Sequence, residues 1–129
     1  MAKRRQSIDL EGIGHSNPIP FASKVGNIVH TGGIFGADPA THAVAPEPER
    51  QAALIFQHVR AVMEKAGGST EDIVFMTFFV KDMQYRDLIN AEWVKMFPDP
   101  ESRPARHTMR QELAGASVMQ CEFMAVLEE

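Results

Sequence analysis

One segment limits the folds open to this chain more than any other. Residues 72–81 read DIVFMTFFVK, and this run of β-branched and aromatic side chains predicts a β-strand. Successive side chains of a strand point to opposite faces, so the set from Ile73 to Phe79 and the set from Val74 to Val80 lie on different faces. Both sets are apolar. The strand therefore needs a covering layer on each side of its sheet.

Two helices are predicted, one before this strand and one after it. Apolar residues recur at helical spacing over residues 48–66, where Pro48 suits the first turn and Gly67-Gly68 supplies a left-handed stop. Asp82 is expected to cap a second helix over residues 84–97, which ends at Pro98.

The remaining segments predict short strands and turns. A strand over residues 22–31 is interrupted at Gly26-Asn27, a strong signal for a hairpin or bulge. A short strand at 34–36 and a turn at 38–42 follow it. Two further strands are expected at 105–112 and 117–127, separated by a turn at Ala114-Gly115-Ala116. We expect residues 1–129 to form one domain, with residues 1–20 as an extended, loop-like lead.

This order of elements leaves part of the sheet without a cover. Two helices can cover only one face of a sheet of this size, and the strand at 72–81 is apolar on both. An exposed apolar sheet surface normally marks an association face. The sequence itself therefore predicts a homo-oligomer.

Composition excludes several classes of partner. The chain has 13 basic and 17 acidic side chains and a formal net charge of -4, so it has no general electrostatic attraction to nucleic acid or anionic lipid. Small molecules and further copies of the chain are the expected partners. The basic start Lys3-Arg4-Arg5 is not followed by an apolar export segment, and no apolar run approaches the ~20 residues that span a bilayer. We therefore expect a cytoplasmic protein without membrane contact.

Metal and disulfide chemistry are not indicated. Cys121 is the single cysteine, so it cannot form an internal disulfide, and it is expected to be an inert thiol. The histidines are scattered along the sequence rather than clustered at metal-ligand spacing. They are His15, His30, His42, His58 and His107. The sequence predicts no metal site.

Arg106 is the strongest candidate for a functional residue. It lies in the run Arg103-Pro104-Ala105-Arg106, early in a predicted strand, where packing does not demand an arginine. Its planar guanidinium can bind a carboxylate through two parallel hydrogen bonds, which a lysine cannot do. The alternative is a surface or interface salt bridge with one of the acidic residues. Strand alternation places Thr108 on the same side as Arg106 and His107 on the other.

Five runs occur in order along the chain: Val25-Gly26-Asn27-Ile28-Val29-His30-Thr31-Gly32-Gly33, Ala66-Gly67, Val80-Lys81-Asp82, Ile89-Asn90-Ala91 and Arg103-Pro104-Ala105-Arg106. Together they resemble the RidA/YjgF family of imine and enamine deaminases, also labelled endoribonuclease L-PSP-like. The resemblance covers about residues 20–126, and the chain has the features of a divergent member.

The resemblance implies an α+β, chorismate-mutase-like fold, in which two helices pack on one face of a mixed β-sheet. It also implies a homotrimer whose sheet faces form a central barrel-like core, which would supply the missing cover. Deaminating members hydrolyse imines and enamines of amino acids to 2-oxo acids and ammonia without a metal or organic cofactor. Their sites lie in clefts between subunits, where an arginine binds the substrate carboxylate.

Carried onto this sequence, the resemblance assigns roles to particular residues. Arg106 would bind the carboxylate, the backbone N–H of Gly32 and the side chain of Asn90 would position it, and water held near Gln120 would attack the C=N carbon. The sequence departs from the family pattern at four positions. Gln120 stands where a glutamate is expected, Gly32 for a serine, Thr108 for a cysteine and Phe21 for a tyrosine. Phe21 keeps an aromatic wall and loses the hydroxyl, and Thr108 keeps a hydroxyl that could donate to substrate.

The change at Gln120 bears most on chemistry. A glutamine can hold a water through its amide but cannot take a proton from it. Glu122, two residues further on, is a weaker candidate for that task. His107 is turned away from Arg106 by strand alternation, and His15 lies in the lead, where a lone histidine is normally solvated.

The leading prediction is a hydrolytic deaminase of imine or enamine acids, or of a related small carboxylic acid. The alternative is a carboxylate-binding or regulatory trimer without turnover, which the departures at Gln120, Gly32, Thr108 and Phe21 favour. A ribonuclease is disfavoured, because the net charge is -4 and the sequence has no basic stripe.

Overall fold

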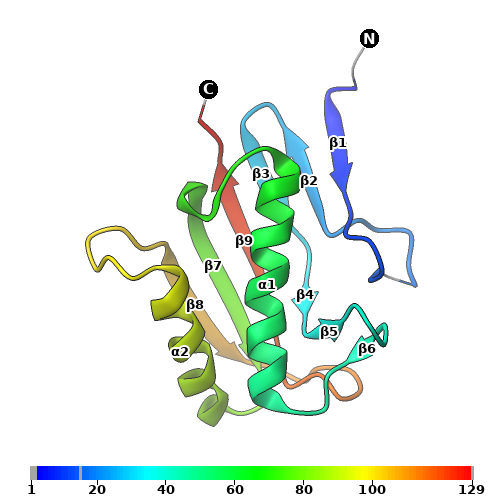
Figure 1. Cartoon of the computed structure of the whole chain (residues 1–129), viewed down its shortest axis with the longest axis vertical. Coiled ribbons are helices and arrows are strands. Elements are labelled where there is room, and N and C mark those ends of the chain that lie inside the picture. Colours follow the sequence, from blue (N-terminus) through cyan, green and yellow to red (C-terminus); the bar gives the residue numbers. More distant parts are fainter. Residues whose placement is uncertain (1–2, 15, 129) are drawn as a thin grey trace.

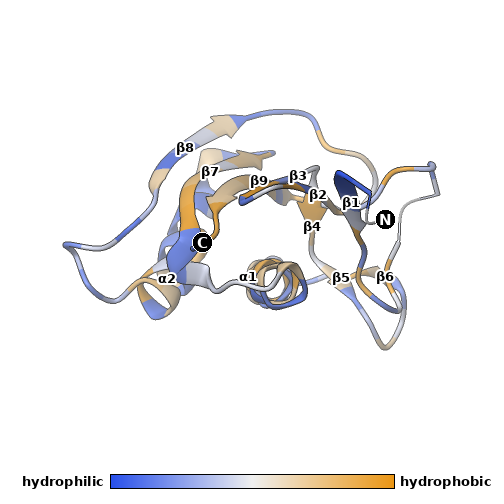
Figure 2. Ribbon diagram, turned by 90° about the horizontal axis from the view of Figure 1, so that it is seen from above, coloured by the Kyte–Doolittle hydropathy of each residue, from blue (hydrophilic) through white to orange (hydrophobic). Residues whose placement is uncertain are grey.

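The computed structural model describes residues 3–14 and 16–128, so His15 lies outside the described residues. Both helices lie against the same face of a mixed β-sheet, and the other face has no covering layer within the described chain (Figures 1 and 2). The strand order is β1-β2-β3-β9-β7-β8, with β4 also paired to β9. Only β7 and β8 run parallel; the other neighbours in this sheet are antiparallel.

The strands are short on one side of the sheet and long at its centre. They are β1 Arg5–Ile8, β2 Ala22–Val25, β3 Ile28–Thr31, β4 Ile34–Phe35, β7 Ile73–Val80, β8 Ala105–Arg110 and β9 Met119–Val126. A separate pair, β5 Ala37–Asp38 and β6 Ala43–Val44, flanks the turn expected at 38–42. The predicted hairpin at Gly26-Asn27 is confirmed, since Gly26 has a positive φ of 59° between β2 and β3.

The two helices begin and end close to the predicted positions. Helix α1 spans Pro48–Ala66 and ends at Gly67, whose φ of 90° gives the left-handed stop. The second segment is divided: Met83–Tyr85 forms a 3₁₀ turn, and α2 spans Arg86–Met96. Asp82 caps this segment as predicted, because its Oδ1 accepts a 2.9 Å hydrogen bond from the N–H of Gln84. A further 3₁₀ turn, Thr70–Asp72, leads into β7.

The expectation of a loop-like lead is wrong for residues 5–8. They form β1, which pairs antiparallel with β2 in a register from Arg5 opposite Val25 to Ile8 opposite Ala22. Ile8 is the one residue of this strand that is buried. A strand with so little apolar pattern is held by backbone hydrogen bonds to a neighbouring edge, and local sequence carries no signal for such pairing.

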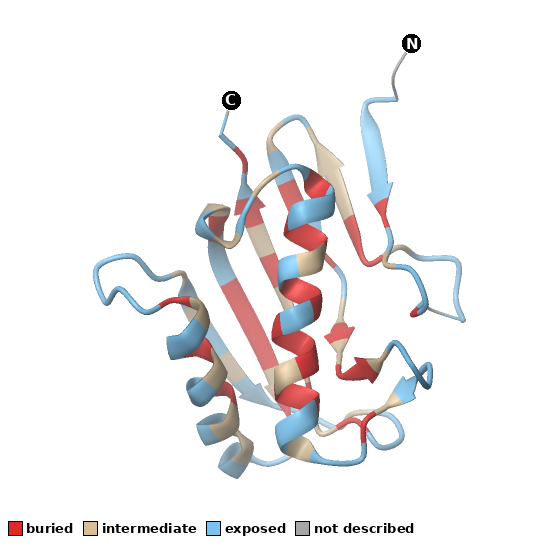
Figure 3. Cartoon of the chain, viewed as in Figure 1, coloured by how far each residue is buried: buried red, intermediate tan, exposed pale blue. Residues whose placement is uncertain are grey.

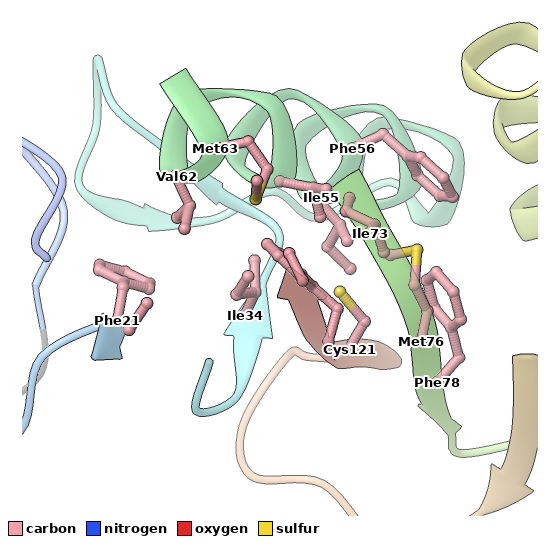
Figure 4. Close-up of a cluster of buried hydrophobic side chains, with 14 of the residues drawn as sticks. Phe21, Ile34, Ile55, Phe56, Val62, Met63, Ile73, Met76, Phe78 and Cys121 are labelled. Carbon is pink, nitrogen blue, oxygen red and sulfur yellow. The ribbon is translucent and has the colours of Figure 1, made fainter. Parts of the chain in front are cut away.

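The hydrophobic core fills the space between the sheet and the helices. Alternate residues of β7 (Met76, Phe78 and Val80) are fully buried against this layer. Phe78 stacks on Phe56 of α1 with ring centroids 5.6 Å apart, and both side chains lie in the cluster that Figure 4 shows. Figure 3 shows buried residues along α1 and along the central strands. The core therefore lies on one side of the sheet.

Gln51 of α1 is the polar side chain that joins this helix to two loops. It is fully buried, and its Nε2 donates to the carbonyl oxygens of Ala45 and Ala116 at 2.8 and 3.0 Å. Its Oε1 accepts a 3.0 Å hydrogen bond from the N–H of Val118. The backbone approach here is close, because a Cβ added at Gly36 would lie 2.6 Å from Gln51 Cα. Only glycine fits at position 36.

The strand at 72–81 was predicted to need a covering layer on both faces, and its outer face lacks one in a single chain. Thr77 is buried, but Phe75 is 40% exposed and Val74 is 50% exposed next to a register shift between β7 and β9. Ile28, Met109 and Val126 are also exposed large apolar side chains. One chain thus covers β7 on the helix side only. No helix of the described residues is long and apolar enough to cross a membrane.

Candidate functional site

Arg106 lies on edge strand β8 with its side chain on the helix side of the sheet. The parallel register pairs Arg106 with Met76 and Thr108 with Phe78, and both partners are buried under the helices. The guanidinium carbon is 4.9 Å from the centre of the Trp93 ring and 5.8 Å from that of Phe78. These distances are within the range of cation–π contacts. The strand and the two rings together fix the plane of the guanidinium.

Asn90 of α2 fixes the direction of that guanidinium. Nη2 of Arg106 donates a 2.6 Å hydrogen bond to Oδ1 of Asn90. Arg106 forms no ion pair with any residue in 3–14 or 16–128, so the alternative of a salt bridge within the chain is not realised. Since a guanidinium has five N–H donors, most of this fork is left for a ligand.

The surroundings of Arg106 disfavour its positive charge. Partial burial, and next the charge of nearby Arg86, lower the pKa of Arg106. An arginine still keeps its proton in such a place. The unfavourable charge is relieved when an anion binds, so this electrostatic environment favours a carboxylate.

Thr108 carries a second polar atom on the same side of β8. Its Oγ1 is buried and has no hydrogen-bond partner among the described residues. Such a hydroxyl costs free energy until it finds a partner. It is a candidate to donate to a ligand that Arg106 holds.

Gln120 lies on the opposite face of the sheet from Arg106. On β9 it pairs with Phe79 of β7, whereas Arg106 pairs with Met76, and residues three apart in a strand point to opposite faces. The Gln120 amide packs over Gly33, where an added Cβ would be 3.4 Å from Nε2. One chain therefore does not bring the two residues together.

Gly32 and Phe21, two residues expected to contact the ligand, are engaged within the chain itself. The N–H of Gly32 donates a 2.9 Å hydrogen bond to the carbonyl oxygen of Phe21, so it is not free for a carboxylate as the sequence suggested. Phe21 is fully buried in the core (Figure 4). Its ring centroid lies 6.4 Å from that of Phe35. It offers no exposed wall within one chain. The hydrogen bond continues the pairing of the β2–β3 hairpin by one residue, and the burial of Phe21 results from tertiary packing, which local sequence does not show.

The remaining candidates also lie on the outer face. His107 and Glu122 are both register partners of Thr77, which places them away from Arg106, as alternation predicted for His107. Glu122 and Thr77 line a hollow on this face together with His30.

Cys121 is fully buried, and burial raises the pKa of its thiol far above the usual range, in keeping with an inert role.

Two residues near Arg106 were not predicted as part of the site. The sequence motifs did not single out Trp93 or Arg86. Both lie on α2 at helical spacing from Asn90, three positions after it and four before it. That spacing is the signal that could have found them. No group of three or more metal-ligating side chains occurs within residues 3–14 and 16–128.

The fold and the arginine define a class of protein: a mixed sheet backed by two helices, with a guanidinium at its edge that has no acidic partner among the described residues. Solved structures share this architecture. RidA from the Antarctic bacterium Psychrobacter sp. PAMC 21119 superposes with a TM-score of 0.86 at 27% identity, covering 95% of this chain and 99% of that one. The YjgF gene product of E. coli gives a TM-score of 0.83 at 28% identity, covering 94% and 98%.

The chain belongs to the RidA/YjgF family, since the family model described as "Endoribonuclease L-PSP" matches residues 16–126. Curated relatives agree. A RutC family protein of Haemophilus influenzae is 38% identical over 64% of this chain. The 2-iminobutanoate/2-iminopropanoate deaminase of Salmonella typhimurium is 37% identical over 64% of the chain. The 3-aminoacrylate deaminase RutC of Acinetobacter baylyi is 30% identical over 72% of the chain. These matches span 63%, 65% and 73% of the relatives' own lengths.

Proposed function

We propose that this protein is a cofactor-independent hydrolytic deaminase of imine or enamine acids, which yields a 2-oxo acid and ammonia. The observation that carries the proposal is the guanidinium of Arg106, held by Asn90 and Trp93 and left without an acidic partner in the described chain. Relatives named for 2-iminobutanoate, 2-iminopropanoate and 3-aminoacrylate deamination support the choice of substrate class. We place the activity in the cytoplasm.

In the proposed reaction, binding and orientation do most of the work. Arg106 holds the substrate carboxylate through two N–H groups, and the buried hydroxyl of Thr108 donates to the ligand. Water adds to the C=N carbon, the resulting amino alcohol transfers a proton to nitrogen, and ammonia leaves as the C=O bond forms. Fixing the electrophile next to a water removes much of the entropic barrier of this addition.

The site that we propose is completed by a second copy of the chain. Gln120 orients the attacking water, and because it lies on the other face of its own sheet, it reaches the Arg106 of a neighbouring subunit. We propose a homotrimer in which the outer sheet faces pack together as a barrel-like core. The exposed apolar residues Ile28, Phe75, Met109 and Val126 support this, because their burial would stabilise the assembly.

A second candidate function rests on Gln120 itself. An amide cannot accept a proton from water, and general acid–base help is commonly worth about 10²- to 10⁴-fold in rate. A trimer that binds small carboxylates without turnover is therefore the alternative. In both functions the ligand is small, and the net charge of -4 argues against nucleic acid.

The test generates 2-iminopropionate in the assay from alanine with an amino-acid oxidase and follows the loss of the imine. We expect the unmodified protein to accelerate ammonia release and the Arg106→Ala variant to lose at least about tenfold in rate. Arg60→Ala removes an exposed arginine of α1 that is not among the residues proposed to contact the ligand, and it serves as the control. Equal rates for Arg106→Ala and unmodified protein would rule out the binding role. Calorimetric binding of pyruvate without any acceleration would instead select the non-catalytic alternative.

A further inference from the structure

Arg86, the first residue of α2, shares a face of that helix with the two residues that hold Arg106. Asn90 follows Arg86 by four positions and Trp93 by seven, and residues at these spacings align along one side of a helix. Asn90 accepts the hydrogen bond from Arg106, and Trp93 lies under its guanidinium. Figure 1 shows α2 running alongside β8. The side of α2 that faces Arg106 thus begins with a second guanidinium.

The positive charge of Arg86 acts on Arg106. The charge of Arg86 lowers the pKa of Arg106, second only to the effect of burial. Arg86 is exposed and forms no ion pair in residues 3–14 and 16–128, not even with its sequence neighbour Asp87. Two cations held side by side without a protein anion are repulsive in the free protein. A ligand with two negative groups relieves that repulsion better than a ligand with one.

We propose that Arg86 is a second carboxylate-binding residue of the Arg106 site, and that the site selects dicarboxylic substrates, the imines of acidic amino acids. This inference rests on the proposed function, in which Arg106 binds the first carboxylate. Arg86 is one helical turn from Asn90, a separation of about 5 to 6 Å between side-chain origins. Two carboxylates joined by a short carbon chain span a comparable distance. Arg86 therefore sets specificity, while Arg106 anchors every substrate.

The experiment measures binding of stable 2-oxo acids to the full-length protein by calorimetry. Pyruvate and 2-oxobutanoate represent monocarboxylates, and 2-oxoglutarate and 2-oxoadipate represent dicarboxylates. We expect the dicarboxylates to bind about tenfold more tightly, as one additional charge-assisted contact would give. Because Arg86 is exposed, this preference should weaken as sodium chloride is raised. Arg86→Gln should lower the ratio of the two affinities towards one, and Arg86→Lys should keep part of it. Arg60→Gln removes an exposed arginine of α1 and should leave the ratio unchanged.

The outcomes separate this inference from the proposed function. Equal binding of both classes, or a preference for dicarboxylates that survives Arg86→Gln, would overturn the role of Arg86. In that case, loss of all binding in Arg106→Gln would show that Arg106 still binds the first carboxylate. If Arg106→Gln binds both classes as tightly as the unmodified protein, the anchor assignment fails and the inference fails with it. If the unmodified protein binds neither class, both the role of Arg106 and the inference about Arg86 fail. A ratio that falls only in the Arg86 variants supports the proposal.

Discussion

Asn90 and Arg106, 16 positions apart in the sequence, are joined by a 2.6 Å hydrogen bond from Nη2 to Oδ1. This bond makes Asn90 a positioning residue for the guanidinium. It differs from the role that the sequence suggested, which was contact with the substrate. The distinction can be tested, because a residue that acts through Arg106 responds to charge in a way that a substrate-contacting amide does not.

Asn90→Asp should weaken carboxylate binding more than Asn90→Ala. The aspartate places a negative charge 2.6 Å from Nη2, where it pairs with Arg106 and competes with the ligand carboxylate. Alanine only frees the guanidinium to move. We expect KM to rise about tenfold or more for the aspartate variant and by less for alanine, with circular dichroism as the control for folding. Equal effects of both substitutions would contradict a positioning role.

Gln120→Glu should increase the rate of imine hydrolysis. A carboxylate at this place can accept a proton from the attacking water, which the amide cannot do, and such help is worth about 10²-fold or more. The pH profile of the variant should gain a loss of rate at low pH, where the new carboxyl is protonated. Gln57→Glu, the same substitution at an exposed position of α1, provides the matched control. An unchanged rate in Gln120→Glu would argue that this residue is not near the reacting water.

Gln51→Ala should destabilise the fold without touching the site. It removes three hydrogen bonds of a fully buried side chain and leaves the groups of Ala45, Ala116 and Val118 unpaired. We expect a loss of about 3 to 5 kcal/mol in the free energy of unfolding, measured with urea. Gln57→Ala, an exposed glutamine of the same helix, should cost no more than about 0.5 kcal/mol. If Gln51→Ala lowers the free energy of unfolding as little as Gln57→Ala does, the three hydrogen bonds of Gln51 do not stabilise the fold.

Stability should fall as the pH drops below about 6.5 because of His58. This buried side chain shares a 2.7 Å hydrogen bond with the carbonyl oxygen of Ala37, and burial lowers its pKa in the folded state. The unfolded chain therefore binds a proton before the folded one, and acid favours unfolding until the folded pKa is reached. Urea unfolding between about pH 7.5 and pH 5.5 measures the slope. Replacing His58 by Gln should flatten it, and a slope that persists unchanged would assign the effect to other groups.

The elements that sequence predicts well here are those whose pattern is long. Helix α1 was expected over residues 48–66 because its apolar positions repeat over several turns, and it spans Pro48–Ala66. Strand β7 was recognisable from its β-branched and aromatic run. Strand β1, with one buried residue in four, depends on pairing with β2 and has no comparable local pattern. The correct expectation that both helices cover one face came from counting elements, not from residue propensities.

The motif made Arg106 a candidate, but the contacts around it could not be predicted from sequence. The helical spacing of Asn90 and Trp93 places them on one side of α2, but it does not predict that this side packs against β8. The N–H of Gly32 meets the carbonyl oxygen of Phe21 because the pairing of the β2–β3 hairpin, in which Ala22 lies opposite Thr31, continues one residue further. The hairpin predicted at Gly26-Asn27 places Phe21 opposite Gly32, whereas the burial of Phe21 depends on tertiary packing, which local sequence does not indicate.

The placement of Arg106 and Gln120 on opposite faces of one sheet has a genetic consequence under the proposed assembly. If each working site takes its arginine from one chain and its glutamine from another, then a chain that lacks Arg106 and a chain that lacks Gln120 are inactive for different reasons. Co-expressed in one cell, the two should form mixed assemblies in which some sites receive both intact side chains. Two defective alleles of the same gene would then complement each other when they are co-expressed.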